Sequence, residues 1–87
     1  MTTRKVSSHA LDQAHRRGVD QVTLNRVADR PEQVLAVRRG REVRQSRIQS
    51  PEGTDYLVRV FVDIAGNHET VVTVYKTSKI AKYWRES

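Results

Sequence analysis

The first third of the chain carries its hydrophobic residues at helical spacing. Leu24, Val27 and Ala28 lie at i, i+3 and i+4, which predicts a helix that buries one face. Asp20 stands where an N-cap is expected, and Pro31 prevents the helix from continuing past it. One apolar face implies that this helix packs against another element of the fold.

A shorter helix is predicted just before it. Ser7 or Ser8 can cap a helix that begins near His9, and Gly18 is a natural stop for it. A narrow apolar stripe on this helix is formed by Ala10, Leu11 and Ala14. Residues 1–6 precede it at the chain terminus, and we expect them to be flexible.

After Pro31 the hydrophobic period changes to two, which is typical of β-strands. Strands are predicted over residues 34–37, 42–49, 56–63 and 70–76. Turn signals separate them at Gly40, at Ser50-Pro51-Glu52-Gly53 and at Ala65-Gly66-Asn67. Residues 78–85 are compatible with a closing helical turn or an extended tail. The sequence therefore predicts a single α+β domain over residues 1–87, with two N-terminal helices packed on a four-stranded antiparallel sheet in the order ααββββ.

The last two predicted strands have one uniformly apolar face. This face consists of Val58, Val60, Val72 and Val74, and we expect it to meet the helices. A hairpin pairs like faces, because a slip of one residue reverses every side chain. With a loop of about five residues, Arg59 would face Thr73 and Leu57 would face Tyr75.

The opposite face of these strands gathers polar groups. Arg59, Thr73 and Tyr75 form one cluster there, and Gln45 and Arg47 share a parity that extends it. A cationic, hydrogen-bonding surface with an aromatic ring suits contacts with phosphates and bases. The same residues also have ordinary structural interpretations, since a Thr–Arg neighbour across two strands stabilises a sheet.

The charge balance favours a polyanionic partner. Sixteen Lys and Arg against ten Asp and Glu give a net charge of +6, and the sequence pI is near 10.3. Such an excess attracts RNA, DNA or an acidic protein, and charge alone does not distinguish these partners. No signal peptide is visible in the opening residues, and the apolar stretches are too short for a membrane span of roughly 20 residues. We therefore expect a cytoplasmic protein that does not enter a membrane.

Most catalytic signatures are missing from the sequence. Its four glycines lie singly in turns, so no phosphate-binding loop is predicted, and there is no Gly-x-Ser-x-Gly elbow. The chain lacks cysteine, and His9 and His15 lie six residues apart, off one helical face, so we expect no metal and no cofactor. The histidine, arginines, lysine, hydroxyls and tyrosine that remain are able to cleave RNA without a metal ion. One group removes the 2′-OH proton, another protonates the leaving oxygen, and a cation stabilises the charged phosphorane.

Four segments together resemble a bacterial family of domains of unknown function. They are Ser8-His9-Ala10 through Arg17-Gly18-Val19, the helix that ends at Pro31, Tyr56-Leu57-Val58-Arg59-Val60, and Val72-Thr73-Val74-Tyr75-Lys76-Thr77-Ser78-Lys79. That family has been grouped with the ribonuclease toxins of the barnase–EndoU–colicin–RelE superfold. The resemblance covers His9 to Trp84, and it implies an RNase-toxin fold with its site on the sheet.

The resemblance also implies roles for individual residues and partners. The catalytic set would be His9, Arg59, Thr73, Tyr75 and Lys79, with His9 as acid or base and Arg59 on the scissile phosphate. RNA contacts would come from Arg17, Gln45, Arg47, Thr77, Ser78 and Lys82. Because His9 is the only well-placed histidine, Arg, Lys or Tyr would have to replace a second one. The implied partners are RNA and a small acidic antitoxin.

The sequence leaves three functions open. The first is a metal-independent endoribonuclease that acts as the toxin of a toxin–antitoxin pair. The second is a non-catalytic nucleic-acid-binding module that uses the same sheet face. The third is a basic interaction domain that docks an acidic protein.

Overall fold

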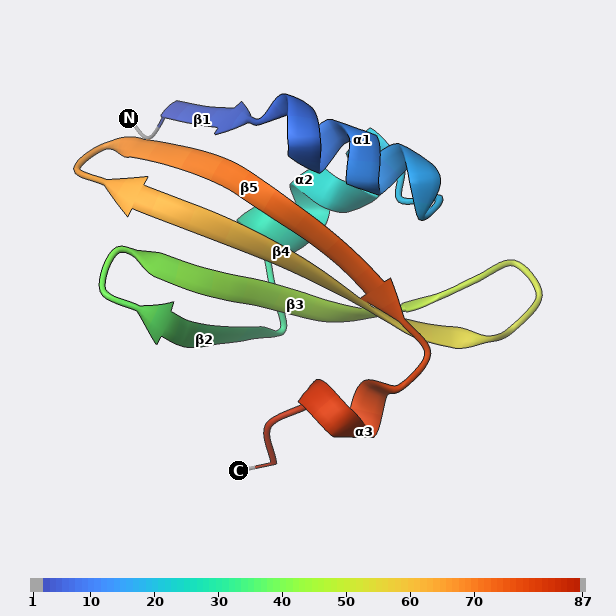
Figure 1. The fold of residues 1–87 in the computed structure, drawn as a ribbon. Coiled ribbons are helices and arrows are strands. Elements are labelled where there is room, and N and C mark those ends of the chain that lie inside the picture. Colours follow the sequence, from blue (N-terminus) through green and yellow to red (C-terminus); the bar gives the residue numbers. More distant parts are fainter. Residues whose placement is uncertain (1–2, 87) are drawn as a thin grey trace.

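One mixed sheet with helices on both of its faces forms the fold (Figure 1). The computed structural model describes residues 3–86. Within that range the elements are β1 (Thr3–Val6), α1 (Ser8–Arg16), α2 (Gln21–Asp29), β2 (Gln33–Arg38), β3 (Arg41–Gln49), β4 (Asp55–Ala65), β5 (His68–Thr77) and α3 (Ile80–Tyr83). The strand order across the sheet is β1-β5-β4-β3-β2. The predicted α+β class is confirmed.

The N-terminal strand β1 corrects two of the predictions. Residues 3–6 are not a flexible terminus, because they pair in parallel with β5 from Thr3 opposite His68 to Val6 opposite Val71. Met1 and Thr2, also predicted to be flexible, lie outside the described residues. The sheet is therefore five-stranded and mixed, not four-stranded and antiparallel. β1 was missed because its pairing partner is remote in the sequence, and local pattern carries no signal for such pairing.

Both predicted helices and their caps are confirmed. The Ser7 hydroxyl accepts a hydrogen bond from the Ala10 amide at 3.0 Å, and α1 is followed by Gly18 with φ of +68°. The Asp20 carboxylate accepts one from the Thr23 amide at 2.7 Å. These caps fix where each helix begins and let both helices lie on the same face of the sheet (Figure 1).

The hairpin of β4 and β5 has a shorter loop and a different register than predicted. Ala65 pairs with His68, so the loop between the paired residues has two residues instead of about five. Arg59 therefore lies opposite Tyr75 and not opposite Thr73. Leu57 lies opposite Thr77, not Tyr75, and Phe61 lies opposite Thr73.

A bulge in this hairpin also changes one core residue. The register shifts between Phe61 and Val62, so that Val62 pairs with Val71. Val71 is fully buried as a result, whereas Val72, which was predicted to face the helices, is only partly buried and outside the core cluster. The main core lies between the helices and the sheet, and it is formed by Ala10, Ala14, Val19, Leu24, Val27, Ala28, Val58, Val60, Val62, Val71 and Val74.

The second face of the sheet has a smaller buried centre. Val43, Gln45 and Leu57 are buried on β3 and β4 although α1 and α2 lie on the other side. The predicted C-terminal helical turn is present as α3, which turns back under this second face (Figure 1). α3 has no buried residue of its own, so it is held mainly by polar and aromatic contacts.

Candidate nucleic-acid interface

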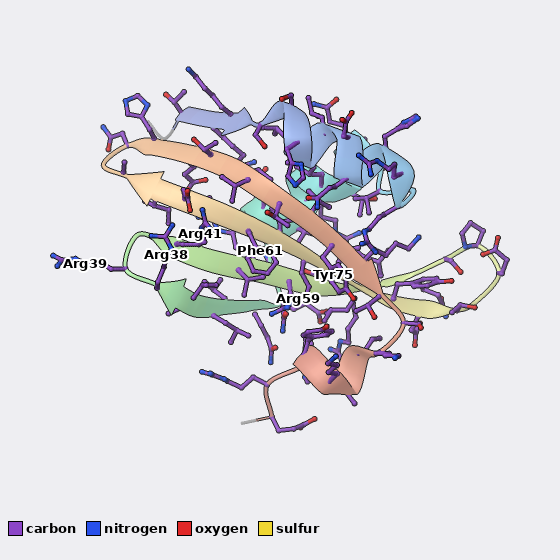
Figure 2. All side chains as sticks on the ribbon, in the orientation of Figure 1. Arg38, Arg39, Arg41, Arg59, Phe61 and Tyr75 are labelled. Atoms are coloured by element: carbon purple, nitrogen blue, oxygen red, sulfur yellow. The ribbon has the colours of Figure 1, made fainter. Side chains whose placement is uncertain are left out.

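A shallow cleft of about 330 Å³ lies on the second face of the sheet, where β4 and β5 meet α3. Its lining residues are Arg59, Phe61, Thr73, Tyr75 and Tyr83. Figure 2 shows Arg59, Phe61 and Tyr75 together on this face. The structure thus brings together three of the residues that the sequence analysis grouped, namely Arg59, Thr73 and Tyr75.

A buried amide holds the guanidinium of Arg59 in place. The Arg59 Nε atom donates a hydrogen bond to Oε1 of Gln45 at 2.9 Å, and Gln45 is completely buried. The Gln45 amide nitrogen donates in turn to Gln33 Oε1 at 2.8 Å and to the Tyr83 carbonyl at 3.2 Å. Gln45, predicted to contact RNA, is therefore a positioning residue beneath Arg59.

Arg59 is a half-buried cation that pairs with no carboxylate in the described part of the chain. Burial lowers the pKa of its guanidinium, which is the sign of a charge that has lost water without gaining an opposite charge. Such a group favours an anion that enters the cleft from outside, and a phosphate fits the fork of donors that arginine presents.

Cations and aromatic rings alternate across the cleft. The Arg59 Cζ atom lies 4.4 Å from the ring centroid of Tyr83 and 5.3 Å from that of Phe61. The rings of Tyr83 and Tyr75 meet edge to face with centroids 5.8 Å apart, and Arg17 Cζ lies 4.7 Å from the Tyr75 centroid. Arg17 of the α1–α2 connection therefore reaches the same cluster across the β5 edge. Flat rings beside fixed guanidinium groups are the components that stack bases and bind phosphates.

The hydroxyl of Tyr83 has a pKa below its ordinary value. Hydrogen bonding with the Tyr75 hydroxyl is the largest cause that lowers the pKa of Tyr83. The positive charges of Lys82 and Arg59 lower that pKa further, whereas burial opposes them. Tyr83 is thus a phenol whose pKa lies below its ordinary value, with the ring of Tyr75 beside it.

The other residues predicted to contact RNA lie around the C-terminal segment. Arg47 forms an ion pair with Glu32 at 2.9 Å and stacks on Trp84, with its Cζ atom 4.3 Å from the ring centroid. The Lys82 amino group lies 5.4 Å from the Tyr83 ring. Arg47 therefore holds the C-terminal segment against the sheet through Trp84, and Lys82 lies beside Tyr83 at the edge of the cleft.

The predicted terminal motif lies at the junction of β5 and α3. The Thr77 hydroxyl accepts a hydrogen bond from the Lys79 amide at 3.0 Å, which shapes the turn into α3. Ser78 and Lys79 are exposed and do not line the cleft. Their exposed side chains are able to contact a ligand that extends beyond the cleft, but not a group bound at its centre.

His9 lies apart from the cleft. It is an exposed residue in the first turn of α1, and α1 packs on the face of the sheet opposite to Arg59 (Figure 1). The structure therefore does not bring this predicted acid or base to the other predicted residues. The cleft lining contains no His, Asp or Glu among the described residues, so the proton-transfer groups within it are tyrosines.

Four residues at or beside the site were not predicted from the sequence, namely Phe61, Tyr83, Trp84 and Gln33. The segment Lys82-Tyr83-Trp84-Arg85 places two aromatic rings between two cations, and this composition is typical of nucleic-acid-binding surfaces. Phe61 has the same parity as Arg59 on β4, which was visible as alternation. Nothing local indicated that Gln33 would bind the C-terminal segment, where its amide donates to the Arg85 carbonyl at 2.7 Å.

Comparisons with protein-family models, curated proteins and solved structures find no match for this chain. Among residues 3–86, no group of three His, Asp or Glu side chains is arranged to hold a metal ion. Every helix in that range is too short or too polar to cross a membrane.

Proposed function

We propose that this protein is an endoribonuclease that binds single-stranded RNA on the second face of its sheet and cleaves it in the cleft without a metal ion. The observation that carries the proposal is Arg59, a half-buried guanidinium that pairs with no carboxylate of residues 3–86 and is held at the cleft by Gln45. The rings of Phe61, Tyr75 and Tyr83 surround it. A phosphate flanked by two bases is the ligand that satisfies this arrangement.

The proposed reaction uses the 2′-hydroxyl of the substrate as its nucleophile. Tyr83, as the phenol with the lowered pKa, takes the 2′-OH proton when it is deprotonated. The new bond forms between O2′ and phosphorus, and the bond from phosphorus to O5′ breaks. Tyr75 gives its proton to the leaving O5′, while Arg59 stabilises the negative charge of the phosphorane. The products are a 2′,3′-cyclic phosphate and a 5′-hydroxyl, so DNA is not a substrate.

The substrate is proposed to be single-stranded because the cleft is shallow and lined by rings. Bases in a duplex are stacked on one another and are not free to stack on Phe61 or Tyr75. A positive surface then tracks the backbone without reading the sequence. The net charge of +6 supports this general attraction.

The test is cleavage of a labelled single-stranded RNA by the purified protein in the presence of a chelator. Arg59→Gln is expected to lower the cleavage rate by about 100-fold, as loss of a group that stabilises transition-state charge does. Tyr83→Phe keeps the ring over Arg59 and is expected to lower the rate by a similar factor while RNA affinity is retained. Arg30→Gln is the matched control, because Arg30 is an exposed arginine at the end of α2 on the other face. Equal activity of all three variants contradicts the proposed site.

A second candidate function is a non-catalytic RNA-binding module that uses the same face. It is favoured by the position of His9 outside the cleft, which leaves tyrosines as the proton-transfer groups there. In that case the wild-type protein binds the RNA with the same dependence on Arg59, but no cyclic phosphate forms. RNA binding without formation of the cyclic phosphate therefore favours the RNA-binding module over the endoribonuclease.

The toxin role is tested separately in cells. Induced expression is expected to arrest growth and degrade RNA, and Arg59→Gln is expected to remove both effects. The proposed antitoxin is a small acidic protein that covers the cleft and relieves the arrest when it is expressed together with the wild-type chain. Growth arrest that persists in Arg59→Gln argues for a different toxic activity.

A further inference from the structure

We propose that an RNA strand held in the cleft continues along β3 and β4 to the turn between β2 and β3, where Arg38 and Arg39 bind its phosphates. This inference rests on the proposed binding of RNA in the cleft, but it does not require cleavage. It assigns a second phosphate-binding site to the sheet and a path across the sheet to the bound RNA.

The turn between β2 and β3 holds more positive charge than its surroundings neutralise. Arg38 lies opposite Arg41 in the β2–β3 pair, and Arg41 lies opposite Asp63 in the β3–β4 pair. The Asp63 carboxylate is bound by Arg41, whose terminal nitrogen donates to Oδ2 at 2.9 Å. Within the described residues this carboxylate pairs with Arg41 and not with Arg38 or Arg39, so both of those guanidinium groups add unpaired positive charge at the turn. Like charges directly opposite on neighbouring strands destabilise a sheet, so an anionic ligand would relieve this arrangement.

Arg38 and Arg39 are the arginines that remain available at this turn. Both are exposed, and within the described part of the chain neither forms an ion pair. Figure 2 shows Arg39 extending away from the sheet, with Arg38 beside Arg41 at the end of the hairpin. Exposed arginines without partners are able to bind phosphates without first breaking an internal contact.

An apolar floor connects the turn to the cleft. Phe61 lies opposite Val43, and Val43 lies opposite Leu35, so three hydrophobic residues cross β4, β3 and β2 side by side. Val43 is only 2% exposed, which shows how closely its neighbours cover it. From Gln45, the strand partner of Arg59, to Arg41 is four residues along β3, or about 13 Å at the rise of a β-strand. The floor offers a base a ring to stack on between two sites for phosphate.

The C-terminal segment covers the sheet on the side of the cleft away from the β2–β3 turn. It covers the end of β3 where Trp84 stacks on Arg47, and the Arg85 amide donates to Gln33 Oε1 at 3.2 Å. A strand that leaves the Arg59 site toward that end would meet these contacts, whereas the β2–β3 turn lies away from α3 (Figure 1). The bound RNA is therefore expected to extend from the cleft to the β2–β3 turn.

The experiment measures binding of two 2′-O-methyl RNAs, which lack the nucleophile and are not cleaved. One is a dinucleotide, whose single phosphate occupies the cleft alone, and the other has about twelve nucleotides and reaches the turn. Arg38→Ala/Arg39→Ala is compared with Arg26→Ala/Arg30→Ala, which removes the same charge from exposed positions on α2. Thermal unfolding of each variant confirms that it is folded.

The Arg38→Ala/Arg39→Ala variant is expected to bind the longer RNA on the order of tenfold more weakly and the shorter RNA as the wild type does. The slope of log affinity against log salt for the longer RNA is expected to fall by about 1.4, since each single-stranded phosphate contact contributes about 0.7. Equal loss for both RNAs, or the same loss in the α2 variant, overturns the proposed path and leaves only a general charge effect. If Arg59→Gln weakens both RNAs while Arg38→Ala/Arg39→Ala changes neither, the second site is refuted and the cleft stands. If the wild type binds neither RNA, the proposed function itself fails.

Discussion

The ring of Tyr83 lies over the guanidinium of Arg59, and both residues are hydrogen-bonded to the buried side-chain amide of Gln45. The Arg59 Cζ atom is 4.4 Å from the ring centroid, while Gln45 accepts a hydrogen bond from Arg59 and donates one to the Tyr83 carbonyl. The C-terminal segment and the centre of the sheet are therefore coupled through Gln45.

The role of Arg59 as a phosphate-binding cation predicts how two substitutions of Gln45 differ. Gln45→Leu and Gln45→Glu both remove the amide donor to Gln33 and Tyr83, and each is expected to lower the free energy of unfolding by about 1–3 kcal/mol. Only Gln45→Glu supplies a carboxylate that competes with phosphate for Arg59. RNA affinity, measured by fluorescence anisotropy, is therefore expected to be on the order of tenfold lower in Gln45→Glu than in Gln45→Leu. Equal affinities would show that Arg59 does not bind the phosphate.

Trp84, the only tryptophan in the chain, reports whether the C-terminal segment lies against the sheet. Arg47 stacks on it, and a cation–π contact near the surface contributes about 0.5–1 kcal/mol. Arg47→Ala is expected to raise the detached fraction of the segment roughly two- to fivefold, with a red-shifted emission and stronger quenching by acrylamide. Glu32→Gln is the matched control, because it removes the ion pair with Arg47 but leaves the guanidinium over the indole. The same red shift in both variants would assign the effect to the ion pair.

The helices were predictable because their signals are local. Ser7 and Asp20 cap segments whose apolar residues follow within a few positions, and no distant contact is needed to recognise them. Residues 3–6 carry no comparable signal, since β1 exists only through its pairing with β5 and through the hydrogen bond from the Ser7 amide to the Val71 carbonyl at 2.9 Å. Pairing across most of the chain is set by tertiary structure and not by local pattern.

The candidate site was found in part although the hairpin register was wrong. Arg59 pairs with Tyr75 instead of Thr73, a difference of two residues, and a shift of two preserves the face on which each side chain lies. Beyond the bulge at Phe61 and Val62, the alternation of side chains between the two faces of the sheet is shifted by one residue. Val72 was therefore wrongly predicted to face the helices. Tyr83 was missed because its position depends on how the chain turns after β5, which no alternation pattern encodes.

The bulge predicts unequal effects of truncating two neighbouring valines. Val71 is fully buried among the core residues, whereas Val72 is only partly buried and lies outside that core. Val71→Ala is expected to lower the free energy of unfolding by about 2 kcal/mol, and Val72→Ala by less than about 1 kcal/mol. Urea denaturation of the two variants measures this difference directly. The reverse order would mean that the bulge is absent and that Val72 faces the helices.

A network of charges beside β1 makes stability depend on pH. Glu69 binds Arg44 at 2.8 Å and also pairs with Arg4, so the charged groups that face it come from both β3 and β1. Hydrogen bonding from Arg44 is the largest cause that lowers the pKa of Glu69 below its ordinary value of 4.5. The folded state therefore binds fewer protons than the unfolded state in this range. The stabilisation from Glu69 is complete above about pH 4.5 and is lost as the pH falls through the lower pKa of the folded state.

Substitution of Glu69 tests this network at two pH values. At neutral pH, Glu69→Gln is expected to lower the free energy of unfolding by about 2 kcal/mol, because the hydrogen bonds to two arginines lose their charge assistance. The gap between wild type and variant is expected to shrink as the pH falls below about 4.5, since the unfolded chain then binds a proton that the folded carboxylate does not, and to be smallest below the lower pKa of the folded state. Asp12→Asn is the control, because Asp12 is exposed on α1 and forms no ion pair within residues 3–86; it is expected to follow the wild type at both pH values. A gap that stays constant down to acidic pH would show that Glu69 contributes through packing and not through its charge.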